Sequence, residues 1–127
     1  MKRVLVVDDS STMRGAIAQV LRSQGYDIAG EAGDADKAIA LYASLRPDLV
    51  TMDIVMPSPS GALRQETAGL EAVKKIRELD PNARIIVISA MNQKEYVGEA
   101  IRAGARDFVA KPFNPMRLRE ALARAEA

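Results

Sequence analysis

The sequence predicts a single α/β domain in which five parallel strands alternate with five helices. Three observations predict this fold. Short apolar runs bounded by turn signals occur five times, and a segment with helical apolar periodicity follows each run. The length of 127 residues suits one domain with one core. Strands that alternate with helices of this length need crossover connections, so we expect a doubly wound parallel sheet with helices on both faces.

The five apolar runs are predicted to be buried strands. They are residues 3–7, 27–32, 48–53, 85–88 and the short segment 108–109. The run at 85–88 is the most strongly β-branched, whereas the run at 27–32 is weaker. The run at 48–53 is apolar through Leu49, Val50 and Met52 and ends on Asp53. In open α/β sheets, functional groups lie at the carboxyl ends of the strands, so Asp53 becomes the first candidate site residue.

Local signals delimit the five predicted helices. The first is capped by Ser10 or Ser11 and runs to about Gln24, and the second follows Asp34 and stops before Arg46-Pro47. The others run from about 69 to 79, from about 93 to 103, and from Pro115 onward. The expected core-facing residues are Met13, Ile17, Val20, Leu21, Ala38, Ile39, Leu41, Tyr42, Leu45, Leu70, Val73, Ile76, Leu79, Met116, Leu118 and Leu122.

Composition excludes several kinds of chemistry. The chain has no Cys and no His, which excludes disulfides, thiolate or imidazole metal sites and Ser-His-Asp triads. The net charge of +1 gives no overall reason to expect a nucleic acid or a membrane as partner. Residues 1–7 are basic and then apolar, but Asp8-Asp9 ends the run, so a strand is expected and not a signal peptide. Cytoplasmic localisation is therefore the default expectation.

Polar residues follow four of the five predicted strands. Asp8 and Asp9 end the first strand, Asp53 the third, Ser89 the fourth and Lys111 the fifth. The carboxyl ends of parallel strands lie at one edge of the sheet. If the strand order is 2-1-3-4-5, the first, third and fourth strands are neighbours, and these side chains are expected to converge. Clustered carboxylates repel one another unless a cation neutralises them, and Mg2+ is a suitable hard cation. A carboxylate nucleophile, a divalent ion and an ammonium are sufficient for phosphoryl transfer.

The chain resembles response-regulator receiver domains, and is most similar in kind to single-domain, chemotaxis-type (CheY-like) regulators. The resemblance covers the whole chain, residues 1–127, and rests on four motifs: Val-Val-Asp-Asp-Ser-Ser-Thr-Met-Arg at 6–14, Met-Asp-Ile-Val-Met-Pro at 52–57, Ile-Ser-Ala at 88–90 and Asp-Phe-Val-Ala-Lys-Pro-Phe at 107–113. It implies the flavodoxin/CheY-like (βα)5 fold with strand order 2-1-3-4-5.

The resemblance also implies a role for each residue of the metal site. Asp53 would be the phosphoacceptor. Asp8, Asp9 and Asp53, with the backbone carbonyl of Val55, would hold Mg2+, and Mn2+ is an alternative ion. The protein would catalyse only its own phosphorylation and slow dephosphorylation, and so would not be an enzyme in the ordinary sense.

Four further residues have roles implied by the resemblance. Ser89 and Lys111 would bind the phosphoryl oxygens, and the peptide bond between Lys111 and Pro112 is expected to be cis. Ser89 and Phe108 would form the conformational switch. The phosphoryl donor would be a phosphohistidine on a partner sensor histidine kinase, because this chain has no His. The switched surface, formed by the fourth helix, fifth strand and fifth helix, would control a downstream protein such as a flagellar switch.

Two departures from the family pattern lead to separate expectations. Val55 and Met91 lie two residues after Asp53 and Ser89, where family members place side chains that flank the hydrolytic water. Both are apolar, which predicts slow self-dephosphorylation. Residues 58–68 form an insertion before Gly69, with the composition of a surface loop. It is either a tolerated extension or a partner contact or partial lid beside Asp53.

Two alternative functions remain open from the sequence. A receiver-like module that binds partners without phosphorylation would need no phosphoryl chemistry, although no acidic residue or Lys of the motif is missing. A phosphohydrolase with an aspartyl nucleophile usually carries a second carboxylate two residues later, where this chain has Val55. A DNA-binding output is not expected, because the sequence ends with the predicted fifth helix.

Overall fold

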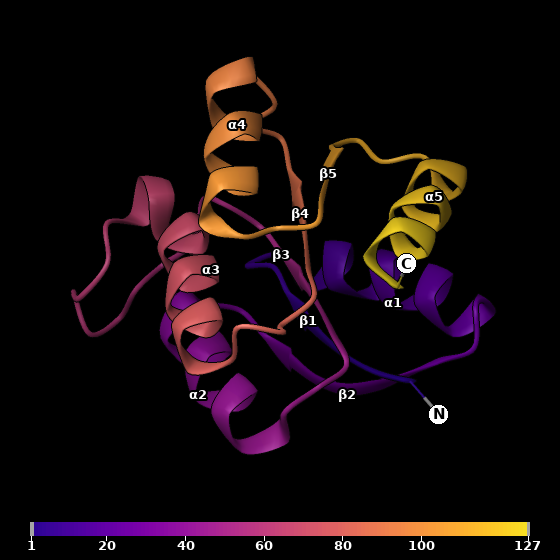
Figure 1. Ribbon diagram of the computed structural model, residues 1–127, viewed down its shortest axis with the longest axis horizontal. Coiled ribbons are helices and arrows are strands. Elements are labelled where there is room, and N and C mark those ends of the chain that lie inside the picture. Colours follow the sequence, from indigo (N-terminus) through magenta and orange to yellow (C-terminus); the bar gives the residue numbers. More distant parts are fainter. Residues whose placement is uncertain (1, 127) are drawn as a thin grey trace.

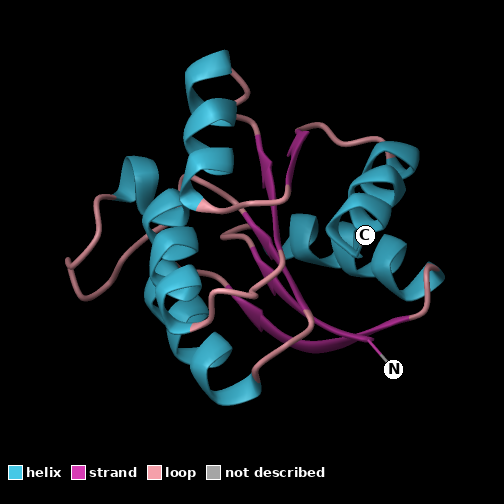
Figure 2. Ribbon diagram, viewed as in Figure 1, coloured by secondary structure: helices cyan, strands magenta, loops and turns pink. Residues whose placement is uncertain are grey.

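The computed structural model describes residues 2–126 and contains one five-stranded sheet (Figures 1 and 2). The strands are β1 (Lys2–Val7), β2 (Tyr26–Ala32), β3 (Leu49–Met52), β4 (Ile85–Ser89) and β5 (Asp107–Ala110). All neighbouring strands pair in parallel, in the order β2-β1-β3-β4-β5. The predicted fold class and strand order are therefore confirmed.

Helices cover both faces of this sheet (Figure 1). They are α1 (Ser11–Ser23), α2 (Ala35–Leu45), α3 (Ala68–Leu79), α4 (Lys94–Ala103) and α5 (Pro115–Glu126), with a 3-10 helix η1 at Gln65–Thr67. One hydrophobic cluster packs α2, α3 and α4 against the sheet, and a second packs α1 and α5 against the opposite face. Side chains alternate between the two faces along each strand, so strand β1 contributes to both clusters. Val4 and Val6 belong to the second cluster, and Leu5 and Val7 belong to the first.

The helix ends follow the local signals closely. Ser10 caps α1, since its hydroxyl accepts a hydrogen bond from the Met13 N–H at 3.2 Å. Asp34 caps α2 in the same way, accepting from the Lys37 N–H at 2.7 Å. Arg46 ends α2 and Gly104 ends α4, both in the left-handed conformation that closes helix C-termini. These caps settle the choice between Ser10 and Ser11.

The structure corrects several details of the sequence-based assignment. Leu79 and Met116 were expected in the core but are 45% and 63% exposed. The segment at 58–68 is not a loop throughout, because residues 65–67 form η1 and the buried Ala68 begins α3. Strand β3 ends at Met52, one residue before Asp53. Among residues 2–126, no helix is long and apolar enough to span a membrane.

Candidate functional site

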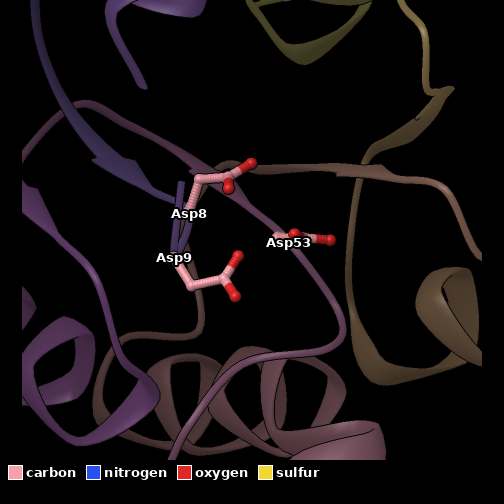
Figure 3. Close-up of side chains that lie close together, drawn as sticks. All are labelled: Asp8, Asp9 and Asp53. Atoms are coloured by element: carbon pink, nitrogen blue, oxygen red, sulfur yellow. The ribbon is translucent and has the colours of Figure 1, made fainter. Parts of the chain in front are cut away.

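Three aspartates lie together at the carboxyl edge of the sheet. Asp8 and Asp9 follow β1, and Asp53 follows the neighbouring strand β3 (Figure 3). Each offers a carboxylate oxygen, and these oxygens lie within 4.8 Å of one another. The parallel pairing produces this arrangement: β1 and β3 end in register, and the Asp53 N–H donates to the Val7 carbonyl at 3.1 Å. The predicted convergence of these three residues is confirmed.

Lys111 reaches the same cluster from the end of β5. Its Nζ donates to Asp8 Oδ2 at 2.6 Å and to Asp53 Oδ2 at 2.9 Å. The Lys111 backbone N–H donates to the Ser89 carbonyl at 2.9 Å, which ties the end of β5 to the end of β4. The Lys111–Pro112 peptide bond is cis.

Burial and neighbouring charges shift the pKa values of Asp53 and Lys111. Burial raises the pKa of the Asp53 carboxyl above its ordinary value, and the charge of Asp8 adds to the effect, while Lys111 only partly opposes it. Burial lowers the pKa of the Lys111 ammonium, but its hydrogen bonds to Asp8 and Asp53 outweigh this, so its pKa is raised. One ammonium thus contacts two carboxylates. With the Asp9 carboxylate, the cluster has three formal negative charges and one positive charge, so two negative charges remain uncompensated.

The orientation of the carboxylates suits a divalent ion. Asp8 is 1% exposed, and its Oδ1 accepts from the Ser10 N–H at 2.9 Å. Asp53 Oδ1 accepts from the Ile54 N–H at 2.8 Å, whereas Asp9 faces solvent. Two carboxylates held by backbone N–H groups beside one open carboxylate form an oxygen-only donor set with excess negative charge. That chemistry fits Mg2+, which binds through one or two carboxylates and retains several waters.

The two predicted switch residues are both buried. Ser89 ends β4, and its hydroxyl oxygen accepts from the Met91 N–H at 3.1 Å. Phe108 is 7% exposed and packs within the cluster formed under α2, α3 and α4. Ser89 is joined to the acidic cluster through its carbonyl and Lys111, while its hydroxyl is engaged locally. Val55 and Met91 are half-buried and pack against the same hydrophobic cluster as Phe108.

Two residues without a predicted role contact the backbone of the site. Arg14 Nη1 donates to the Asp8 carbonyl at 2.6 Å. Gly69 lies against the backbone after β3: its N–H donates to the Ile54 carbonyl at 2.8 Å, and a Cβ there would sit 1.7 Å from the Asp53 carbonyl oxygen. Arg14 lies at the end of the motif at 6–14, which was the available signal, whereas Gly69 follows the insertion and its contact with Ile54 spans fifteen positions of the chain.

The segment between Pro57 and Gly69 is anchored to α2. Asp36 accepts hydrogen bonds from the Ser58 hydroxyl at 2.8 Å and from the Ser60 N–H at 2.7 Å. At the neck of the segment, the Met56 N–H donates to the Gln65 carbonyl at 3.2 Å. In Figure 1 the segment projects outward beside α3. It is therefore an ordered feature with its own contacts.

Comparison with known proteins defines the class to which this fold and site belong. A family model, described as the response regulator receiver domain, matches residues 4–123. The chain belongs to this family, and it is a CheY-like receiver domain of the two-component signalling systems.

Individual relatives are similar over nearly their full length. The chain is 50% identical to the chemotaxis protein CheY of Thermotoga maritima, over 95% of this chain and 94% of that protein. It is 47% identical to the protein CcdB of Bacillus subtilis, over 98% and 97%. Among solved structures, it superposes with a TM-score of 0.89 and 30% identity on a chain of the CheX–CheY–BeF3–Mg2+ complex from Borrelia burgdorferi, covering 99% of this chain and 90% of that one.

Proposed function

We propose that this protein is a phosphorylation-activated response regulator, with Asp53 as the phosphoacceptor and residues 1–127 as its receiver domain. The observation that carries the proposal is the shared ammonium: Lys111 contacts both Asp8 and Asp53, and the cluster keeps two uncompensated negative charges. Such a site is suited to one divalent cation and one phosphoryl group.

The proposed reaction is transfer from a phosphohistidine of a partner sensor kinase. A carboxylate oxygen of Asp53 attacks the phosphorus, the P–N bond breaks, and the imidazole nitrogen leaves with the electron pair. Asp8, Asp9, Asp53 and the Val55 carbonyl would hold Mg2+, whose positive charge would offset the carboxylates and the phosphoryl oxygens. Lys111 turns from the carboxylates to a phosphoryl oxygen, and the Ser89 hydroxyl donates to another.

Phosphorylation would then change the surface formed by α4, β5 and α5. A phosphoryl group adds nearly two negative charges and three strong acceptors beside Ser89. The Ser89 hydroxyl accepts from the Met91 N–H, so its proton is free to donate to the phosphoryl group. A shift of Ser89 toward the phosphoryl group would leave space on the side of the sheet where Phe108 packs. The two movements shift an existing equilibrium between two conformations of this surface, and an effector protein responds by binding one of them more tightly.

Intact-mass measurement tests the proposal directly. The protein is incubated with Mg2+ and acetyl phosphate, beside an Asp53→Asn variant and a sample with chelator. We expect one phosphoryl adduct on the wild type with Mg2+ and none in either control. An absent adduct on a folded wild type would favour a module that acts without phosphorylation. Continuous multiple-turnover release of phosphate from phosphomonoesters would favour the hydrolase.

A further inference from the structure

The guanidinium of Arg14 links three elements beside the acidic cluster. Arg14 belongs to α1, and its Nη1 donates to the Asp8 carbonyl at 2.6 Å while its Nε donates to Glu31 on β2 at 2.9 Å. The Arg14 side chain is only 19% exposed. A Cβ at Gly33 would lie 3.4 Å from Nη1, an ordinary contact distance, so the guanidinium packs directly beside the end of β2.

The helix dipole does not favour an arginine at this position. Arg14 closes the first turn of α1, where its N–H bonds to the Ser10 carbonyl, and that turn contains no acidic residue. A cation near a helix N-terminus interacts unfavourably with the helix dipole. The contact with the Asp8 carbonyl accounts for the residue better than any effect on the helix.

The carbonyl that Arg14 holds belongs to the peptide group joining Asp8 to Asp9. The other side of Asp8 is already fixed, because its N–H donates to the Ala32 carbonyl at 3.0 Å. The plane of the Asp8–Asp9 peptide sets the direction of the exposed Asp9 carboxylate relative to the buried Asp8 carboxylate. An arginine can hold this plane while also bonding Glu31, since its planar fork presents several donors in fixed geometry.

We infer that Arg14 is a positioning residue for the metal site: it holds the Asp8–Asp9 peptide so that both carboxylates face one divalent cation. This inference rests on the proposed function, and it assigns Arg14 no contact with the ion or the phosphoryl group. It acts through backbone geometry, and its positive charge by itself would oppose cation binding. Outer groups that orient metal ligands commonly change metal affinity by about 10- to 100-fold when they are removed.

Calorimetric titration with Mg2+ tests this role in the full-length protein. Arg14→Gln is expected to raise the Mg2+ dissociation constant about tenfold. Arg14→Lys keeps the charge but not the fork, and is expected to weaken binding nearly as much. The matched control is Glu31→Gln, which removes the negative charge that Arg14 pairs with but leaves the contact between Arg14 and the Asp8 carbonyl. Its Mg2+ affinity is therefore expected to stay within about twofold of wild type.

The outcomes separate positioning from charge and from general stability. Tighter Mg2+ binding by Arg14→Gln, or wild-type affinity in either Arg14 variant, would overturn the inference. A lower unfolding midpoint in chelator with unchanged Mg2+ affinity would show a purely structural role. If Arg14→Gln does not fold, Arg14→Lys carries the test.

A kinetic readout separates this inference from the proposed function. With acetyl phosphate, the Arg14 variants are expected to need about tenfold more Mg2+ for half-maximal labelling and to reach the wild-type rate at saturation. Loss of the maximal rate with unchanged Mg2+ requirement would contradict a positioning role. Failure of the wild type itself to bind Mg2+ or accept the phosphoryl group would refute the proposed function, and this inference with it.

Discussion

Gly69 shows at the scale of one residue how the backbone of α3 determines the position of Asp53. A Cβ at residue 69 would lie 1.7 Å from the Asp53 carbonyl oxygen and 2.7 Å from Ile54 Cα, and both atoms belong to the backbone. Backbone atoms cannot move aside as a flexible side chain does. The start of α3 therefore approaches the site more closely than any residue with a side chain would allow.

Replacing Gly69 is expected to destabilise the protein and disturb the site together. Gly69→Ala should lower the free energy of unfolding by about 1–3 kcal/mol, the usual cost of forcing an extra methyl into a packed region. Urea denaturation measures the change. Gly15→Ala is the matched control: Gly15 is exposed within α1 with nothing within 4 Å of an added Cβ, so this change should raise stability by about 0.5–1 kcal/mol. Equal effects at the two positions would contradict the argument.

Val55 and Met91 lead to a second prediction for single residues. Both side chains are half-buried and follow Asp53 and Ser89 by two residues, and neither can orient a water for attack on a phosphoryl group. We expect slow decay of the phosphorylated wild type. Val55→Asn or Met91→Glu should accelerate decay about tenfold, equivalent to about 1.4 kcal/mol of barrier. Intact mass followed over time after removal of acetyl phosphate measures the rates, and unchanged decay in both variants would refute the role.

At the scale of elements, Asp36 connects α2 to the segment at 58–68. Hydrogen bonds from the Ser60 N–H, which has the larger effect, and from the Ser58 hydroxyl stabilise the Asp36 carboxylate and lower its pKa below the ordinary 3.8. Next to the segment, the Pro57 carbonyl accepts from the Ala35 N–H at 3.0 Å. The insertion is thus fastened to α2 within a few residues of Val55.

The lowered pKa of Asp36 predicts how this fastening depends on pH. A carboxyl whose folded pKa is depressed contributes stability above its unfolded pKa, and the contribution is lost as pH falls through the folded value. Wild type should therefore be more stable than Asp36→Asn near pH 6, and the difference should shrink below the ordinary pKa of 3.8. Urea midpoints at several pH values measure it. Glu66→Gln, an exposed change in η1, should alter neither the midpoint nor its pH dependence.

At the scale of the whole molecule, the sheet order brings distant parts of the chain to one point. Strands β1 and β3 are neighbours although α1, β2 and α2 separate them in sequence. Lys111 reaches Asp8 across 103 positions of the chain. An ion held by Asp8, Asp9 and Asp53 would therefore join segments that unfolding separates, and its binding free energy would add to that of folding.

Mg2+ is accordingly expected to stabilise the entire domain. At a concentration one hundred times its dissociation constant, it should raise the free energy of unfolding by about 2.7 kcal/mol. Urea denaturation in Mg2+ and in chelator at matched ionic strength measures the gain. Asp9→Asn removes the solvent-facing carboxylate and should abolish most of it. A gain of the same size in Asp9→Asn would show that the stabilisation does not come from this site.

The sequence by itself determined the strands, most helix ends and which candidate residues follow the strands. These features depend on local information. The β-branched run at 85–88 is a strand, Ser10 and Asp34 cap helices through bonds to residues three positions later, and aspartates follow the carboxyl ends of β1 and β3. The strand order came from the family resemblance, because no local pattern specifies which strands become neighbours.

Only the tertiary structure decided how the site is held and which apolar residues are covered. Lys111 is shared between two carboxylates, Arg14 holds the Asp8 carbonyl, and Gly69 abuts the Asp53 backbone. Leu79 and Met116 follow the helical apolar pattern but are exposed near the C-terminus of α3 and the N-terminus of α5. Periodicity identifies the face of a helix that turns inward. How far along that face the neighbouring elements cover the helix is decided only in the folded chain, as are the contacts between segments distant in sequence.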